Sequence, residues 1–494
     1  MEQIIAKGRS LVDSYGRERI FNGMNVCDKG RYVPEADKRV YGELWKKGTA
    51  KQLKQGGIEL IRLGFVWDAV EPEMGKYDDA FLDSIKAILD ECAEAGVYAY
   101  LDMHQDLYGG YGEVAGDGAP GWAAITGKYK FRKPVAVWAE GYFWGKAVHT
   151  AFDNFWNNTN LCGKGIQDRY VDMWCHVAMK LGSHEAVIGF DVMNEPFPGS
   201  DGGVVFRKII CKLVLTTIFD KSISLAKLIK LALNSAERPK VLDFYGGEQL
   251  RKITSVADGL IKNFDLKKYS PFLNRTTKAI RKINTDKMMF MENSYYSNLG
   301  IPYSCPVPEV DGKKDEKVVF APHAYDFMVD TPEYKYANNG RVKSIFDEHK
   351  RSQERLDVPL IVGEWGGFTE GNEWFHHVKF LLKLFDSNKW SHTYWAFFNG
   401  LLESELFNEV LKRPHPVAVT GRIESYCHDR EKNTFELNYE QDTEFDVPTE
   451  VFLHKTPVSI ETDGKYEIEK YDGCDTAMLK IRTGKGSHSV KVAF

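Results

Sequence analysis

The sequence lacks several features that mark large classes of protein. No run of apolar residues approaches the roughly 18 that a membrane-spanning helix needs. Residues 1–14 contain no apolar core of signal-peptide length, so we expect either a cytoplasmic protein or a secreted one whose leader has been trimmed. The formal net charge of −5 offers no basic field for nucleic acid. We therefore expect neither a membrane span nor a nucleic-acid partner.

The spacing of the cysteines gives no sign of a metal site. None of the eight cysteines belongs to a CxxC pair, which argues against a zinc site. We expect most of them to be reduced and buried, while a disulfide stays open as an alternative. The sequence predicts no metal and no cofactor.

Aromatic residues and length are the first positive signals. The chain has 494 residues, enough for a large core and more than one domain. Aromatic residues make up 13% of it, including 11 Trp and 24 Tyr. This composition suits surfaces on which sugars stack, although aromatic side chains also fill cores.

Strand and helix patterns alternate along most of the chain. Helical spacing is predicted at 41–55, 78–95 and 166–181. Apolar strand patterns are predicted at 20–26, 58–63, 97–104, 186–194, 287–292, 317–323, 358–364 and 390–397. Eight strands with intervening helices predict a (β/α)8 TIM barrel, whose active site lies at the carboxyl ends of the strands.

The pattern changes after the eighth strand. Short alternating runs separated by polar turns from residue 417 onward predict a C-terminal all-β sandwich that packs on the flank of the barrel. We therefore predict a barrel domain over 1–408, with a helical insertion at 203–286, and a sandwich domain over 409–494.

Two of the predicted strands end in a glutamate. The fourth delivers Asn194 and Glu195 before Pro196, and the seventh ends at Glu364. Either residue alone could be a strand-end partner in a structural ion pair. Together they are what glycoside hydrolysis requires, with one protonated general acid and one ionised nucleophile. A positive group near Glu364, with Arg62 as the candidate, is expected to keep it ionised.

From the second strand onward, every strand end except that of strand five carries a polar or aromatic group suited to sugars. The expected set is Arg62 on strand two, Asp102, His104 and Asp106 on strand three, Asn194 on strand four, His323 and Tyr325 on strand six, and Trp395 on strand eight. A metal held by His104, Asp106 and His323 is the weaker alternative, because such sites normally have tighter local spacing.

These motifs resemble glycoside hydrolase family 5, a retaining family, and most closely its endoglycoceramidase branch. The stretches that carry the resemblance are 102–106 (DMHQD), 116–120 (GDGAP), 151–156 (AFDNFW), 191–196 (DVMNEP), 363–366 (GEWG) and 414–421 (PHPVAVTG). It covers nearly the whole chain. The last of these stretches and the strands after it look like the β-sandwich of that branch.

The resemblance implies roles for individual residues. Glu195 would be the acid/base and Glu364 the nucleophile, while Asn194 would hold the sugar 2-hydroxyl and Tyr325 would position Glu364. The implied substrate-binding residues are Lys29, Arg62, His104, Asp106, Trp156, Asn194, His323, Tyr325 and Trp395. Lys29 and Trp156 lie in loops where the correspondence is less direct.

The predicted insertion contains an apolar stretch at 204–234 with a basic polar face. Its bases are Arg207, Lys208, Lys212, Lys221, Lys227 and Lys230, and its only acid is Asp220. Such a pattern is typical of helices that dock on membrane surfaces. It is equally typical of a surface helix packed on the barrel with a solvated charged face, and both interpretations stay open.

The resemblance implies hydrolysis of the bond between a glycan and the ceramide of a glycosphingolipid. Aromatic residues that could meet the lipid are Phe131, Trp138, Tyr142, Phe143 and Trp144. A steryl-β-glucosidase and an endo-acting glucanase or mannanase are alternatives within the same class. A non-catalytic glycolipid-binding protein is the alternative from another class, and the presence of both glutamates argues against it.

Overall fold

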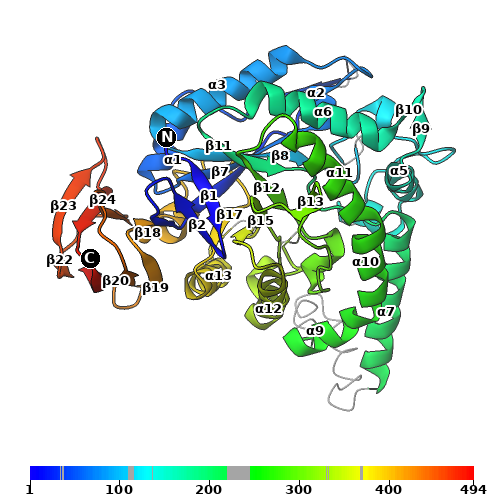
Figure 1. Cartoon of the computed structure of the whole chain (residues 1–494). Coiled ribbons are helices and arrows are strands. Elements are labelled where there is room, and N and C mark those ends of the chain that lie inside the picture. The colour runs from blue at the N-terminus through cyan, green and yellow to red at the C-terminus, as the bar shows by residue number, and fades with distance from the viewer. Residues whose placement is uncertain are drawn as a thin grey trace.

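Eight parallel strands form the centre of the molecule. The computed structural model describes residues 1–494 except 34, 36–37, 110–115, 136, 220–244, 330, 332 and 368–370. The strands are β4 (Asn22–Cys27), β7 (Leu60–Val66), β8 (Tyr98–His104), β11 (Val187–Asp191), β12 (Met288–Met291), β15 (Val318–Phe320), β16 (Ile361–Val362) and β17 (Ser391–Tyr394). Parallel bridges from Phe320 to Leu360 and from His323 to Glu364 join β15 to β16. The predicted barrel is confirmed (Figure 1).

Helices surround this barrel. They are α1 (Thr49–Gln55), α2 (Trp67–Val70), α3 (Asp79–Ala95), α4 (Glu140–Trp144), α5 (Lys146–Trp156), α6 (Ile166–Leu181), α7 (Ser200–Phe219), α9 (Gly247–Thr254), α10 (Asp258–Phe264), α11 (Ser270–Arg281), α12 (Asn339–Leu356) and α13 (Phe375–Asn388). The Asp78 side chain caps α3 by accepting from the Phe81 N–H, and Gly96 ends that helix at φ 71°. The predicted helix at 41–55 is correct only from Thr49, because Gly42 and Gly48 adopt positive φ before it.

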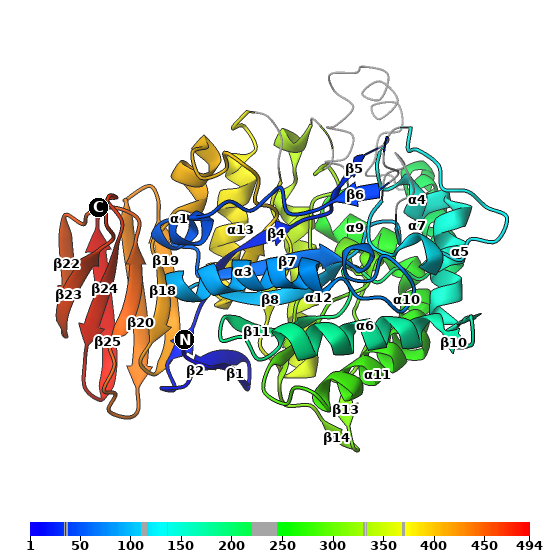
Figure 2. The same cartoon turned by 90° about the horizontal axis from the view of Figure 1, so that it is seen from above.

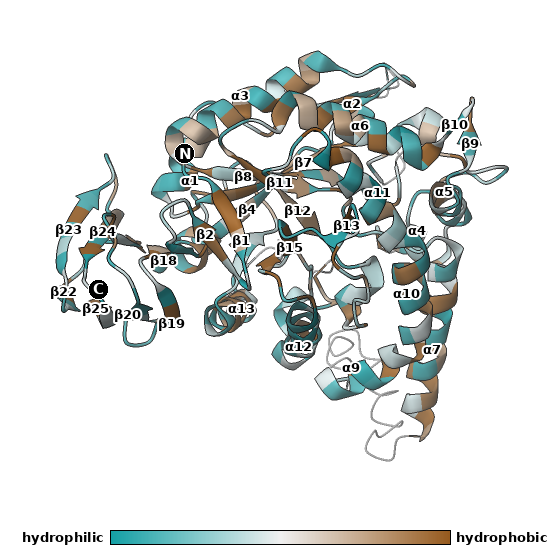
Figure 3. Cartoon of the chain, in the orientation of Figure 1, coloured by the Kyte–Doolittle hydropathy of each residue, from teal (hydrophilic) through white to brown (hydrophobic). Residues whose placement is uncertain are grey.

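The barrel strands are apolar because helices cover their outer faces and side chains fill the interior. Every residue of β7 and β8 is buried, and the strands form the brown centre of Figure 3. Inside the barrel Tyr100 stacks on Phe290, with ring centroids 4.2 Å apart. This packed interior leaves polar side chains to gather at the carboxyl ends of the strands.

The C-terminal part is all-β, as predicted. One sheet runs β19 (Arg422–Asp429), β20 (Thr434–Gln441), β25 (Gly486–Ala493), β22 (Ser459–Thr462), and the other contains β18 (His415–Val419), β21 (Thr449–Leu453), β24 (Ala477–Arg482) and β23 (Lys465–Lys470). The second sheet continues into β1 (Ile4–Lys7), β2 (Ser10–Asp13) and β3 (Glu18–Arg19), beside the barrel (Figure 2). The start of the chain thus joins this sheet through β3 and β18, and the domain limits given above stay predictions.

Short hairpins and tight helical turns complete the connections. The hairpins pair β5 (Arg31–Val33) with β6 (Lys38–Val40), β9 (Asn160–Leu161) with β10 (Lys164–Gly165), and β13 (Glu309–Val310) with β14 (Lys313–Lys314). No helix among the described residues is both long and apolar enough to cross a bilayer. All eight cysteines are free, but only Cys92 and Cys305 are buried, so the expectation that most are buried is wrong.

Candidate active site

Glu195 and Glu364 meet at the carboxyl ends of the barrel strands. One carboxylate oxygen of each and a ring nitrogen of His323 all lie within 4.8 Å of one another. Glu195 and Glu364 follow β11 and β16, and their side chains are 9% and 6% exposed. Retaining glycosidases hold their two carboxyl groups about 5 Å apart, whereas inverting enzymes leave room for a water between them. The observed separation suits a nucleophile and an acid/base.

The Arg62 guanidinium lies fully buried beneath this pair. Its nitrogens contact Glu364 Oε1 at 2.6 Å, Asp102 Oδ1 at 3.0 Å and Asp191 Oδ2 at 3.0 Å, and also contact Glu292. Four carboxylates therefore share one guanidinium, whose five N–H donors suit several acceptors. Because Arg62 has no exposed surface, it supports Glu364 from below, and a direct contact with sugar stays a prediction.

The two oxygens of Glu364 are held from different strands. Oε1 faces Arg62 on β7, and Oε2 accepts a hydrogen bond of 2.9 Å from the Tyr325 hydroxyl after β15. His323, from the same segment as Tyr325, lies with Nδ1 3.6 Å from that oxygen. Such contacts fix the direction in which the carboxylate points, as a nucleophile requires.

The Glu195 carboxyl group contacts neutral side chains. Burial raises the pKa of Glu195 to about 7, and the nearby Asp106 carboxylate adds to the rise. Its Oε1 accepts 2.6 Å from Asn298 Nδ2 and lies 3.1 Å from His323 Nδ1. Burial also lowers the pKa of His323 to about 3, so that ring is neutral. A carboxyl group that titrates near 7 can both give and take a proton at neutral pH.

A second group of predicted residues forms one wall of the site. Lys29 forms an ion pair with Asp106, and its ammonium lies 4.7 Å from the centroid of the Trp395 ring. His104 stacks on Trp395 with centroids 5.2 Å apart and lies 3.6 Å from Asp106 Oδ2. The structure therefore brings together four predicted residues from three separate parts of the chain: Lys29, the pair His104 and Asp106, and Trp395.

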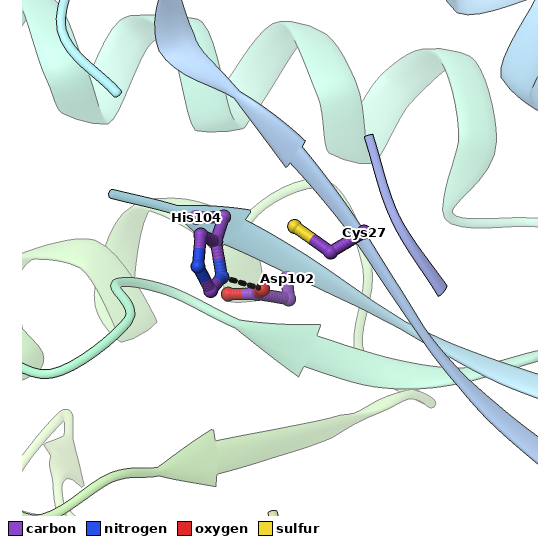
Figure 4. A group of neighbouring side chains, drawn as sticks. All are labelled: Cys27, Asp102 and His104. Atoms are coloured by element: carbon purple, nitrogen blue, oxygen red, sulfur yellow. Dashed lines mark hydrogen bonds and ion pairs between the residues drawn. The ribbon is translucent and has the colours of Figure 1, made fainter. Parts of the chain in front are cut away.

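The orientation of His104 is fixed from behind the wall. Its Nδ1 lies 2.8 Å from Asp102 Oδ2, and the Cys27 thiol from β4 faces the same pair (Figure 4). Asp102 thus holds His104 through one oxygen and Arg62 through the other. This double contact couples the wall to the carboxylates below it.

The remaining two predicted residues have mainly internal contacts. Asn194 accepts a hydrogen bond of 3.0 Å from Arg62 and donates one of 3.1 Å to the Gln105 carbonyl. Trp156 donates 2.7 Å to the Phe197 carbonyl and packs edge-on against Phe264. Among the described residues no contact links Trp156 to either glutamate, so its role in substrate binding stays a prediction.

Several clusters of side chains among the described residues have atoms suited to bind a metal. Asp102, Asp191 and Glu292 offer oxygens within 4.8 Å of one another, as do groups of Cys27, Asp102 and His104. In the first cluster, the Arg62 guanidinium contacts all three carboxylates and supplies the positive charge that a metal would bring. His104 and His323 belong to different clusters, which does not fit the combined set considered from the sequence.

Comparison with known families agrees with this geometry. The profile described as Cellulase (glycosyl hydrolase family 5) matches residues 12–220 and 258–400. The chain belongs to glycoside hydrolase family 5. A second profile, the glycoside hydrolase family 5 C-terminal domain, matches residues 413–492 of this family 5 chain.

Individual relatives of the family 5 chain include two animal proteins named endoglycoceramidase. The one from Hydra vulgaris is 24% identical over 467 residues, covering 87% of this chain and 76% of that protein. The one from Cyanea nozakii is 34% identical over 215 residues, covering 39% of this chain and 41% of that protein, which is less than half its length. The solved structure of endo-glycoceramidase II from Rhodococcus sp. shares the fold, with a TM-score of 0.73, 23% identity and 98% of both chains covered.

Two residues of this family 5 site escaped sequence reasoning. Strand five was expected to contribute nothing, yet Glu292 follows β12 and accepts 2.7 Å from the Glu195 N–H. Asn298 follows in the turn at Tyr295–Leu299. The apolar run before Glu292 is the same signal that identified Glu195 and Glu364, so it could have been found. Nothing in the local sequence marks Asn298.

Proposed function

We propose that the chain is a retaining glycoside hydrolase that cleaves the β-glycosidic bond between a glycan and the ceramide of a glycosphingolipid. The observation that carries the proposal is the buried pair Glu195 and Glu364, which have one carboxylate oxygen of each within 4.8 Å of the other. The names of the Hydra and Cyanea relatives support the lipid-linked substrate class. A non-catalytic binding protein would not need two carboxylates held in this way.

In the first step, Glu364 attacks the anomeric carbon and forms a glycosyl ester. The bond from that carbon to the ceramide oxygen breaks, and Glu195 gives its proton to the departing oxygen. The contacts from Arg62 and Tyr325 hold the attacking carboxylate in place. In the second step, Glu195 takes a proton from water, and the resulting nucleophile cleaves the ester and releases the glycan.

The wall beside Glu364 supplies the sugar contacts in this proposal. Trp395 is half-buried and supplies an aromatic surface for a sugar beside the His104 ring and the Lys29 ammonium that lie against it. Asp106, which contacts both of these residues, adds a polar group. Asn194 lies next to Glu195, between Arg62 and the His104 side of the site. That position suits a contact with the sugar 2-hydroxyl, which strengthens in the transition state.

The lipid part of the substrate implies a membrane surface, and α7 is the element we assign to it. Exposed apolar side chains run along its second half, with Val214, Ile218 and Phe219 at 49%, 53% and 75% exposure. Trp144 at the end of α4 is 58% exposed, and its ring contacts Phe206 of α7. We call this surface the α7 face: Trp144, Ile210, Val214, Leu215, Ile218 and Phe219. Tyr142 is fully buried and does not belong to it.

Basic residues accompany the α7 face. Arg207, Lys208 and Lys212 lie on the same helix, and Arg207 and Lys208 are exposed. The predicted bases Lys221, Lys227 and Lys230 and the acid Asp220 lie outside the described residues. An apolar face flanked by bases suits an anionic bilayer, in which each base near the surface contributes on the order of 1 kcal/mol.

Reversing the charge of Arg207, Lys208 and Lys212 to glutamate is expected to weaken binding to anionic vesicles by about 100-fold or more. Sedimentation with phosphatidylserine-containing vesicles measures this loss. Hydrolysis of a water-soluble aryl glycoside should stay unchanged, because the reversed residues lie outside the site.

The matched control reverses three exposed lysines of the C-terminal part, Lys465, Lys470 and Lys485. This variant has the same net charge and is expected to bind vesicles like the wild type. Equal binding by the α7 variant and the wild type would contradict docking through α7 and favour a helix that simply packs on the barrel.

Product analysis tests the substrate proposal. Wild type and Glu195→Gln are incubated with gangliosides, globosides, glucosylceramide, a steryl glucoside, a β-glucan and a mannan, and the released glycans and lipids are identified. We expect intact glycan and ceramide from the wild type, and a rate about 10²- to 10⁴-fold lower from the variant. Preferential cleavage of the steryl glucoside, or of a β-glucan or mannan, would overturn the ceramide assignment. Binding without cleavage would overturn the enzyme.

A further inference from the structure

Strand five contributes a segment that contacts Glu195 at two points. Glu292 follows β12, and the turn that begins at Tyr295 brings Asn298 back towards the same glutamate. Glu292 accepts from the backbone N–H of Glu195, and Asn298 donates to its side chain. One short segment therefore holds both the main chain and the carboxyl group of a single residue.

The backbone of Glu195 needs such support. Its φ of 42° is positive, a conformation that residues other than glycine seldom adopt because it strains the backbone. The 2.7 Å hydrogen bond to Glu292 Oε2 satisfies its N–H, and Gln105 Nε2 donates to its carbonyl at 3.3 Å. The other oxygen of Glu292 contacts Arg62. Glu292 thus links the strained residue to the guanidinium that holds Glu364.

The amide of Asn298 can face Glu195 in only one way. The backbone N–H of His323 donates 2.8 Å to Asn293 Oδ1, which fixes the Asn293 amide because a backbone N–H is always a donor. Asn293 Nδ2 then donates 2.6 Å to Asn298 Oδ1. The NH₂ group of Asn298 is left to face Glu195 Oε1, at 2.6 Å. A backbone group thus sets the orientation of two side-chain amides in series.

We propose that Asn298, oriented by Asn293, is a positioning residue that keeps the transferable proton of Glu195 on Oε2. An oxygen that accepts from an amide NH₂ is a poor place for a proton, because the proton would replace an acceptor lone pair and face another donor. The proton therefore resides on the second oxygen, from which it is delivered to the leaving group. The proposal rests on the proposed acid/base role of Glu195.

The electrostatics of the site agree with this geometry. Burial and the Asp106 carboxylate raise the pKa of Glu195 to about 7, whereas the Asn298 hydrogen bond, His104 and Arg62 act in the opposite direction because they favour the ionised carboxylate. The His323 ring, which burial keeps neutral, faces the same oxygen with Nδ1 3.1 Å from Oε1. Asn298 is only half-buried, and Asn293 is fully buried. The Asn298 amide that donates to Oε1 thus limits the rise in the pKa of Glu195 and keeps that pKa near 7.

The test is the pH dependence of kcat/KM on an octyl β-glycoside of the released sugar, whose alkoxide leaving group needs protonation. In the wild type we expect activity to fall above an apparent pKa near 7, as Glu195 loses its proton. In Asn298→Leu the lost donor raises the pKa of Glu195, so the basic limb should move up by about one pH unit. Asn298→Ala, which leaves more room, should move the limb in the same direction.

Asn274→Leu is the matched control, because Asn274 lies on α11 and accepts from the Glu309 N–H. Its basic limb should stay at the wild-type position. A lower rate with an unmoved limb in both Asn298 variants would show a purely structural role and overturn the proposal, as would a limb moved to lower pH. Failure of the proposed function looks different, since the wild type would then either release no sugar from any glycoside or cleave a steryl glucoside or a polysaccharide in preference to ceramide glycosides, whatever the position of the limb in the Asn298 variants.

Discussion

Replacing Glu364 with alanine is expected to lower kcat by about 10⁴-fold or more while leaving the fold intact. Glu364 is where Arg62 and Tyr325 converge, at 2.6 and 2.9 Å, and no other described carboxylate combines this support with a position within 4.8 Å of Glu195. Steady-state kinetics on an aryl glycoside measures the loss. Glu403→Ala, at an exposed position after the last barrel strand, is the control and should keep full activity.

Azide separates the two roles. At Glu364→Gly the small anion can attack the anomeric carbon from the vacated side, so we expect a glycosyl azide of inverted configuration. At Glu195→Ala the covalent intermediate still forms from an activated substrate, and azide should release it with retained configuration. A variant pair in which azide restores neither reaction would contradict the assignment of both glutamates.

The sequence was most informative where chemistry follows directly from secondary structure. A buried parallel strand must be apolar until it leaves the barrel, so its first charged residue lies at the catalytic edge. This reasoning located Glu195 and Glu364 and predicted their proximity without knowledge of any contact. His104 and Tyr325 were found in the same way, at the end of one predicted strand and two residues beyond the end of another.

The residues that were missed depend on contacts between distant parts of the chain. Glu292 had the right local pattern, but its meaning comes from Arg62, which lies 230 positions away. Asn298 lies in a turn rather than at a strand end, and only the path of that turn brings it to Glu195. The strands β1 to β3 are at most four residues long and pair with a sheet from the other end of the chain. Periodicity over such short segments carries little information.

Arg62→Met is expected to lower the free energy of unfolding by about 3–5 kcal/mol, because it leaves four carboxylates without the cation that all of them contact. Chemical denaturation monitored by tryptophan fluorescence measures the change. Arg9→Met is the control: its pair with Asp357 is more than half exposed, at 51% and 72%, and such pairs contribute less than about 1 kcal/mol.

The stability lost in Arg62→Met should also depend on pH in a definite direction. Burial raises the pKa of Asp191 to about 7 and that of Glu292 well above its usual range, even with the guanidinium present. Without Arg62 these pKa values rise further, so the folded variant binds more protons than the unfolded chain from about pH 4 upward. The slope of the unfolding free energy against pH is proportional to the number of protons bound by the unfolded state minus the number bound by the folded state. This difference is negative here, so the stability of the variant falls as pH rises. We therefore expect a larger deficit at pH 8 than at pH 5. An equal deficit at both values would mean that Arg62 stabilises the barrel by packing rather than by holding its carboxylates.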